Sequence, residues 1–177
     1  MKKAIDIILL IFMFLIIYFL QINFFTRFKI FEVMPNLFII FIMMIGLFLK
    51  KDFGIFFGIC FGLLLDFFIG TRIGIFSISL GLVGLTSGFL EKSFSKDSKI
   101  TLILMGAILT SLFELVVYVL NIFFNGITNI ELIVFIKILL IEVLYNSILI
   151  IIIYPIFIKF GTKLEGDFIN INFLNFL

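Results

Sequence analysis

The sequence has no histidine, no tryptophan and a single cysteine, Cys60. A lone cysteine cannot form a disulfide within the chain. Without histidine, the chain cannot build a Ser-His or Cys-His relay, a histidine-ligated metal site or a histidine proton shuttle. Any enzymatic mechanism would therefore rest on carboxylates alone, and we expect a protein that is not an enzyme and holds no metal or cofactor.

Charged residues are also scarce, at 14% of the chain, and the formal net charge is only +2. Soluble domains carry about 25% charged residues, and about half or fewer of their residues are apolar. Here 64% of the residues are apolar, so the composition excludes a water-soluble globule. The small and dispersed positive charge gives no reason to expect nucleic acid as a partner.

What the sequence has instead is long apolar runs separated by short connectors. A membrane helix needs ~20 consecutive apolar residues. We predict an all-α polytopic integral membrane protein, a bundle of six transmembrane helices forming one domain over residues 1–160, followed by a short cytoplasmic tail over 161–177. The predicted spans are approximately 4–25, 33–49, 53–69, 73–90, 100–124 and 130–160.

The distribution of lysine and arginine predicts the orientation. With the N-terminus in the cytoplasm, nine of these residues lie at the cytoplasmic side and three, Arg27, Lys29 and Arg72, at the outer side. The positive-inside rule therefore predicts that both termini are cytoplasmic. Lysines before an apolar stretch also occur in signal peptides, but no small-residue cleavage pair follows this run. We expect a retained first helix.

The sixth run is longer than a bilayer requires. We expect it to be tilted or to begin as an interfacial segment. Pro155 is expected to kink or fray its far end, because proline cannot donate the helical backbone hydrogen bond. The tail after residue 160 alternates apolar residues with asparagine. It either lies on the membrane surface or is poorly ordered.

Glycines recur at helical spacing in the third and fourth runs. Gly54, Gly58 and Gly62 follow one another at intervals of four residues, which places them on one helix face. Lipid supplies no hydrophobic drive for helices to associate, so close packing relies on such small residues. We expect the third and fourth runs to form the most closely packed pair, with Gly70 and Gly74 at their connection.

Four ionisable side chains lie inside the predicted spans, away from their ends: Asp66, Glu114, Lys137 and Glu142. Each costs roughly 2.5 to 3.5 kcal/mol at a helix centre, so such residues are seldom kept without a role. In the predicted orientation, all four lie in the middle or outer half of the bundle. We hypothesise that Asp66 orders the connection from Gly70 to Gly74.

Two polar stripes lie at overlapping depth on the fifth and sixth runs, so these helices are expected to face each other or a small polar cavity. The predicted intramembrane polar cluster is Glu114, Lys137, Glu142, Tyr145 and Asn146. Its interpretation stays open between a network that fixes the bundle, a ligand cavity and a surface that docks a partner. Lys137 could pair with Glu114 or Asp66, or extend outward to the membrane surface.

A longer motif links the second and third runs. Pro35 and Asn36 open the second run, and Lys50-Lys51-Asp52 follows it. Next comes Gly54-x3-Gly58-x3-Gly62-Leu63-x2-Asp66-x3-Gly70-x3-Gly74. This pattern resembles the rod shape-determining protein MreD family, in which Pro, Asp or Asn, and Leu precede a glycine-rich helix with one Asp. Asn36 stands where that family often has Asp.

The resemblance implies a multi-pass protein of the bacterial cytoplasmic membrane. It implies a non-enzymatic scaffold or regulator of the cell-elongation machinery for peptidoglycan synthesis, which maintains cell shape. The implied partners are an MreC-like bitopic protein, RodA, a class B penicillin-binding transpeptidase, MreB filaments and membrane lipid. The family is also similar in fold to the six-helix S components of energy-coupling factor (ECF) vitamin transporters.

The alternative function is that of such a substrate-binding S component. These components typically present small residues on their first helix, where they dock to the coupling protein. In residues 4–25 the only clearly small residue is Ala4. The first helix therefore favours the scaffold over the transporter component.

Overall fold

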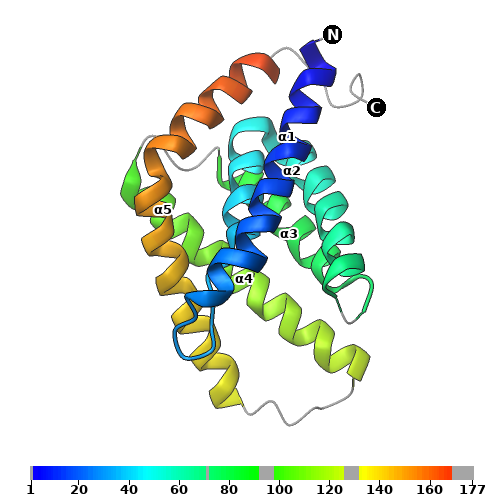
Figure 1. Ribbon diagram of the computed structural model, residues 1–177, viewed down its shortest axis with the longest axis vertical. Helices are drawn as coiled ribbons and strands as arrows, with labels where there is room; N and C mark the ends of the chain where they lie inside the picture. The colour runs from blue at the N-terminus through cyan, green and yellow to red at the C-terminus, as the bar shows by residue number, and fades with distance from the viewer. Residues whose placement is uncertain (1, 71, 92–97, 126–131, 169–177) are drawn as a thin grey trace.

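The computed structural model describes residues 2–70, 72–91, 98–125 and 132–168 (Figure 1). Within these ranges the chain is helical, and the one β-type contact is an isolated bridge between Ile30 and Val33. The helices are α1 (Lys2–Phe19), continued by a π-helical turn η1 (Leu20–Phe24) and a 3-10 turn η2 (Phe25–Arg27), then α2 (Leu37–Phe68), α3 (Ile75–Leu90), α4 (Lys99–Asn125) and α5 (Leu132–Phe168).

Three of the described helical stretches are long and apolar enough to cross a membrane. They are Ile7–Arg27, Lys99–Phe124 and Leu132–Gly166. The outward side chains along them are mostly large and apolar, as a lipid-facing surface requires. The chain is therefore an all-helical membrane protein, as its composition predicted.

Helix α2 reverses direction at Lys50, whose backbone is left-handed and extended (φ 73°, ψ 168°). In a continuous helix residues 46 and 54 would lie about 12 Å apart. Instead, a Cβ built on Gly54 would lie 2.9 Å from the Cα of Gly46. The rings of Phe41 and Phe61 also stack, with centroids 5.8 Å apart. Thus α2 is a hairpin with a first arm over 37–49 and a second arm over 51–68, and Figure 1 shows the two arms side by side.

The predicted turn Lys50-Lys51-Asp52 is shorter in the structure, because Lys51 and Asp52 are already helical. The first arm also begins at Leu37 rather than at residue 33. Residues 30–33 form a tight turn, closed by hydrogen bonds in both directions between Ile30 and Val33. The Val33 carbonyl oxygen accepts from the Ile30 N–H, and the Leu37 N–H donates to Gln21, so the helical bond between Val33 and Leu37 is not made and the helix begins after the turn.

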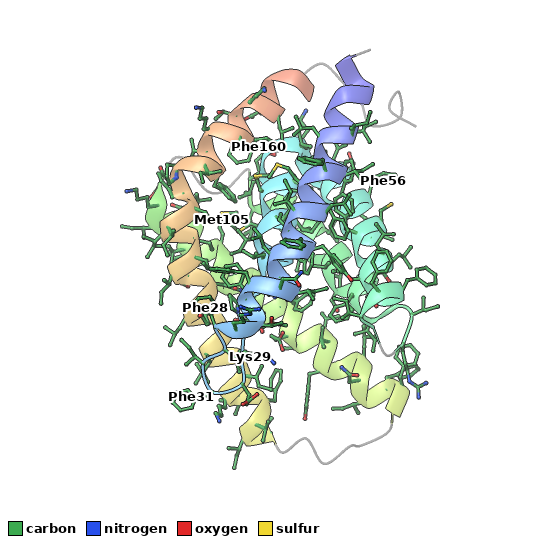
Figure 2. All side chains as sticks on the ribbon, viewed as in Figure 1. Phe28, Lys29, Phe31, Phe56, Met105 and Phe160 are labelled. Carbon is green, nitrogen blue, oxygen red and sulfur yellow. The ribbon has the colours of Figure 1, made fainter. Side chains whose placement is uncertain are left out.

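The first arm of α2 is the centre of the bundle. Every residue from 37 to 49 is buried, which fits a segment that is apolar on all its faces. Phe14 of α1 packs over the hairpin, 4.4 Å from the ring centroid of Phe61 and 5.7 Å from that of Phe38. On the other side the hairpin contacts α4 and α5, where Met105 of α4 is fully buried (Figure 2).

The helix that contains the predicted last span, α5, continues past residue 160 to Phe168. Gly161 lies against the ring of Phe48, and Leu164 is buried, so the added turns pack on the core. The predicted tail is therefore helical over 161–168, and 169–177 lies outside the described residues. Pro155 lies inside α5, which changes direction in its second half in Figure 1.

Candidate functional site

The second arm of α2 and helix α3 meet backbone to backbone. A Cβ at Gly54 would clash with the carbonyl oxygen of Gly84, and a Cβ at Gly84 would clash with that of Gly54. Gly58 and Gly62 face the backbone of α3 in the same way, at Leu80 and Ser77. The glycine face therefore packs inside the bundle and leaves no space for a ligand along this contact.

Asp66 holds the start of α3. Its carboxylate oxygens accept hydrogen bonds from the backbone N–H groups of Gly74 (2.9 Å), Phe76 (2.8 Å) and Ser77 (3.1 Å). The first N–H groups of a helix have no partner within the helix, and a negative charge there also suits the helix dipole. Gly74 adopts φ 115°, a conformation that only glycine takes readily. Asp66 is thus a buried cap of α3, and it fixes the connection that leads from the second arm of α2 to that helix.

A cavity of about 440 Å³ lies between the α4–α5 pair and the segment that joins η2 to α2. Its lining combines acidic, amide and aromatic side chains. The lining residues are Gln21, Phe31, Glu32, Val33, Met34, Pro35, Asn36, Phe76, Phe113, Glu114, Val117, Val134, Lys137, Ile138 and Glu142. Of the predicted polar cluster, Glu114, Lys137 and Glu142 therefore share one cavity with Pro35 and Asn36 of the motif.

Two carboxyl groups from different helices meet in this cavity. Glu142 of α5 is only 5% exposed, and it lines the cavity together with Glu114 of α4 and Asn36. Its Oε1 atom is buried and is the one such side-chain oxygen or nitrogen in the described part of the chain without a hydrogen-bond partner. The cavity thus holds a buried acceptor that the protein itself does not satisfy.

The floor of the cavity is fixed by amide side chains. The Gln21 Nε2 atom donates to the Pro35 carbonyl oxygen (2.7 Å), and the Leu37 N–H donates to Gln21 Oε1 (3.1 Å). Asn36 in turn caps α2, because its Oδ1 accepts from the Phe38 N–H (3.2 Å). The π-helical turn η1 is what brings Gln21 to this position.

Asn146 joins the same floor to both long helices. Its Oδ1 accepts from the Asn36 N–H (2.8 Å), and its Nδ2 donates to the hydroxyl of Thr110 on α4 (3.0 Å). Asn146 and Thr110 are both fully buried or nearly so. The first arm of α2, α4 and α5 are therefore tied together directly beneath the cavity.

The rim of the cavity is formed by the turn at residues 30–33. Phe31 and Glu32 both have positive φ, 50° and 71°. The Lys137 ammonium group lies over the ring of Phe31, 5.3 Å from its centroid. Tyr145 donates from its hydroxyl to the carbonyl oxygen of Phe28 (2.6 Å), which fastens this loop to α5. Figure 2 shows Phe28 and Phe31 on this loop, beside α5.

Comparison with protein families identifies the chain. The family model described as rod shape-determining protein MreD matches residues 1–164 of the 177. The chain belongs to the MreD family. Comparisons with curated proteins and with solved structures gave no match.

Membership gives this MreD-family chain a role in rod shape determination. The match spans every described residue that lines the cavity, so the cavity belongs to the part of the chain that the family defines. Asp66 and the glycine face lie apart from it, against α3.

Sequence reasoning missed three polar residues of this site: Gln21, Thr110 and Glu32, which precedes the second run. Gln21 and Thr110 are polar side chains inside predicted spans, which is the signal that could have found them. Tyr145 was assigned to the polar cluster, but it bonds the outer loop and does not line the cavity. Lys137 was expected to pair with Glu114 or Asp66 or to extend outward. It is exposed and faces Phe31, while Asp66 caps α3.

Proposed function

We propose that this MreD-family protein is a non-enzymatic scaffold of the cell-elongation machinery for peptidoglycan synthesis. It would span the bacterial cytoplasmic membrane six times with both termini in the cytoplasm, the two arms of α2 counting as two segments. Its fold would be similar to that of an ECF S component. The family match over residues 1–164 is the observation that carries the proposal.

The proposed partners are an MreC-like bitopic protein and, through it or directly, RodA, a class B penicillin-binding transpeptidase and MreB filaments. The exposed apolar side chains of α1 support this role, since a single partner helix could pack on them in the membrane. They include Ile8, Phe12 and Phe19, each more than 60% exposed.

The proposal is tested by purifying the tagged protein from its native membrane in mild detergent and identifying co-purified proteins by mass spectrometry. We expect an MreC-like protein together with RodA-like or transpeptidase partners. Recovery of an ATPase-linked coupling protein, or of a bound vitamin, would instead identify an S component.

Asp66→Asn and Asp52→Asn form a matched pair for the same experiment. Asp66→Asn replaces one of the capping oxygens of α3 with an amide nitrogen, so we expect less partner recovery and poorer rescue of rod shape in cells lacking the protein. Asp52 is exposed beside the Lys50 reversal, and its variant should behave as wild type. Unchanged recovery and shape with Asp66→Asn would show that assembly does not depend on this cap.

A further inference from the structure

We propose that the cavity between α4, α5 and the 30–36 segment binds an ammonium group, with Glu142 and Glu114 as its anionic receptors. The ammonium group would belong to a free organic amine or to the headgroup of an aminophospholipid. This inference concerns a ligand and does not depend on the partners proposed above.

The first argument is the unsatisfied acceptor. Glu142 is 5% exposed and lines the cavity, and its buried Oε1 atom has no hydrogen-bond partner. A buried oxygen without a hydrogen bond costs ~1–3 kcal/mol or more when it belongs to a charged group. Such an atom at a cavity wall indicates a donor that arrives with a ligand.

The second argument is charge. The Glu142 and Glu114 side chains line the same cavity, and two carboxylates that share a site favour a positive group between them. Glu32 adds a further acidic side chain at the rim. Among the described residues of the lining, Lys137 is the only basic one, and it is exposed and lies over the Phe31 ring. The interior of the cavity therefore favours a cation.

The third argument is size and lining, which favour an organic cation over a metal ion. A cavity of about 440 Å³ is much larger than one hydrated ion needs. The described residues contain no group of three or more acidic, cysteine or histidine side chains that could hold a metal. The lining also presents the rings of Phe31, Phe76 and Phe113, and aromatic faces attract ammonium groups.

The position of the cavity also fits a ligand that enters from the membrane surface. The first arm of α2 is about 20 Å long from Lys50 to the cavity floor at Asn36, whereas the hydrocarbon core is ~30 Å thick. In the orientation proposed above, Lys50 lies at the cytoplasmic membrane surface, so the floor lies below the outer surface. The rim turn that carries Glu32 stands above it, so a headgroup or a soluble amine could reach the glutamates past this turn.

The test uses the full chain in lipid nanodiscs and isothermal titration calorimetry, with empty nanodiscs as the blank. The probe is phenethylammonium, and 2-phenylethanol is the neutral control of similar shape. We expect saturable binding of the amine and none of the alcohol. Equal binding of the two compounds, or no saturable amine binding, would overturn the proposal.

Glu142→Gln and Glu114→Gln test the receptors, and Glu91→Gln, at the far end of α3, is the matched control. Each cavity variant should weaken amine binding roughly tenfold or more, since hydrogen bonds between charged groups are lost. Glu91→Gln should leave the affinity unchanged. Should Glu142→Gln fail to fold, Glu114→Gln decides the matter, because Glu114 is only half-buried. Wild-type affinity for the amine in a folded cavity variant would contradict the assignment. Displacement of the amine probe by Mg²⁺ would contradict it as well, because it would indicate a metal site.

The lipid composition of the nanodiscs distinguishes the two sources of the ammonium group. If the natural ligand is a lipid headgroup, phosphatidylethanolamine should compete and weaken probe binding relative to phosphatidylglycerol, and wild type should retain more of it than Glu142→Gln in native mass spectrometry. If the ligand is a free amine, probe affinity should be the same in both lipids.

Discussion

The two halves of the bundle each bury an acidic side chain, and they surround it in opposite ways. On the α2–α3 side, Asp66 accepts three backbone hydrogen bonds and lies in a tightly closed, glycine-lined contact. On the α4–α5 side, Glu142 keeps an oxygen without a partner and borders a cavity of about 440 Å³.

The comparison teaches that an intramembrane carboxylate is not by itself a sign of a ligand site. Moving either carboxylate from water into the membrane costs free energy. Hydrogen bonds from the protein offset this cost at Asp66 but only in part at Glu142. The satisfied residue explains stability and the unsatisfied one suggests binding. Three substitutions, measured as unfolding in detergent, test that division.

The largest effect is expected at the glycine contact. Gly84→Ala would place a Cβ against the carbonyl oxygen of Gly54, where both partners are backbone and neither can move aside cheaply. We expect a loss of about 3 kcal/mol or more in the free energy of unfolding, or failure to fold.

Gly166→Ala is the matched control, because a Cβ there meets nothing within 4 Å. In a helix this change should be neutral or stabilising by up to about 1 kcal/mol. Similar unfolding of the two variants would mean that the α2–α3 contact is looser than the structure shows.

An intermediate effect is expected for Asp66→Ala. The N–H groups of Gly74, Phe76 and Ser77 lose their acceptor, which should cost about 2–4 kcal/mol. Asp52→Ala, at an exposed position, should change stability by less than about 1 kcal/mol. A wild-type unfolding temperature for Asp66→Ala would indicate that other groups replace the cap.

The smallest effect is expected for Glu142→Gln. It removes an acceptor that has no partner, and the new amide can donate to Glu114, so the change in stability should lie within about 1 kcal/mol of zero. A loss as large as that of Asp66→Ala would make Glu142 a structural residue and would erase the contrast between the halves.

Much of the fold could be predicted from single residues and their spacing. The apolar runs correspond to the helices, and the four-residue glycine repeat identified the face that packs on α3. The sharp reversal at Lys50 could not be resolved beyond a short charged turn, because a positive φ at lysine has no sequence signature. The helical turns of α5 after residue 160 could not be predicted, because the polar residues there give no sign of the contact between Gly161 and Phe48.

The site was predictable only in part. The sequence predicted that Glu114 and Glu142 belong to one polar cluster, because they lie at overlapping depth in the predicted membrane helices. The bonds of Gln21 and Asn146 to the Pro35–Leu37 segment depend on a π-helical turn and on which faces meet. Helical periodicity defines faces, but it does not specify their neighbours.

The reversal of α2 fixes the number of residues that can join the two arms of the hairpin. Lys50 is the only non-helical residue between the two arms, and Gly46 and Gly54 lie four positions on either side of it. One residue inserted into the helical stretch between Lys50 and Gly54 would rotate the glycines of the second arm by roughly 100° relative to the reversal, turning them away from α3. The number of residues at this reversal is therefore constrained as strictly as any side chain in the bundle.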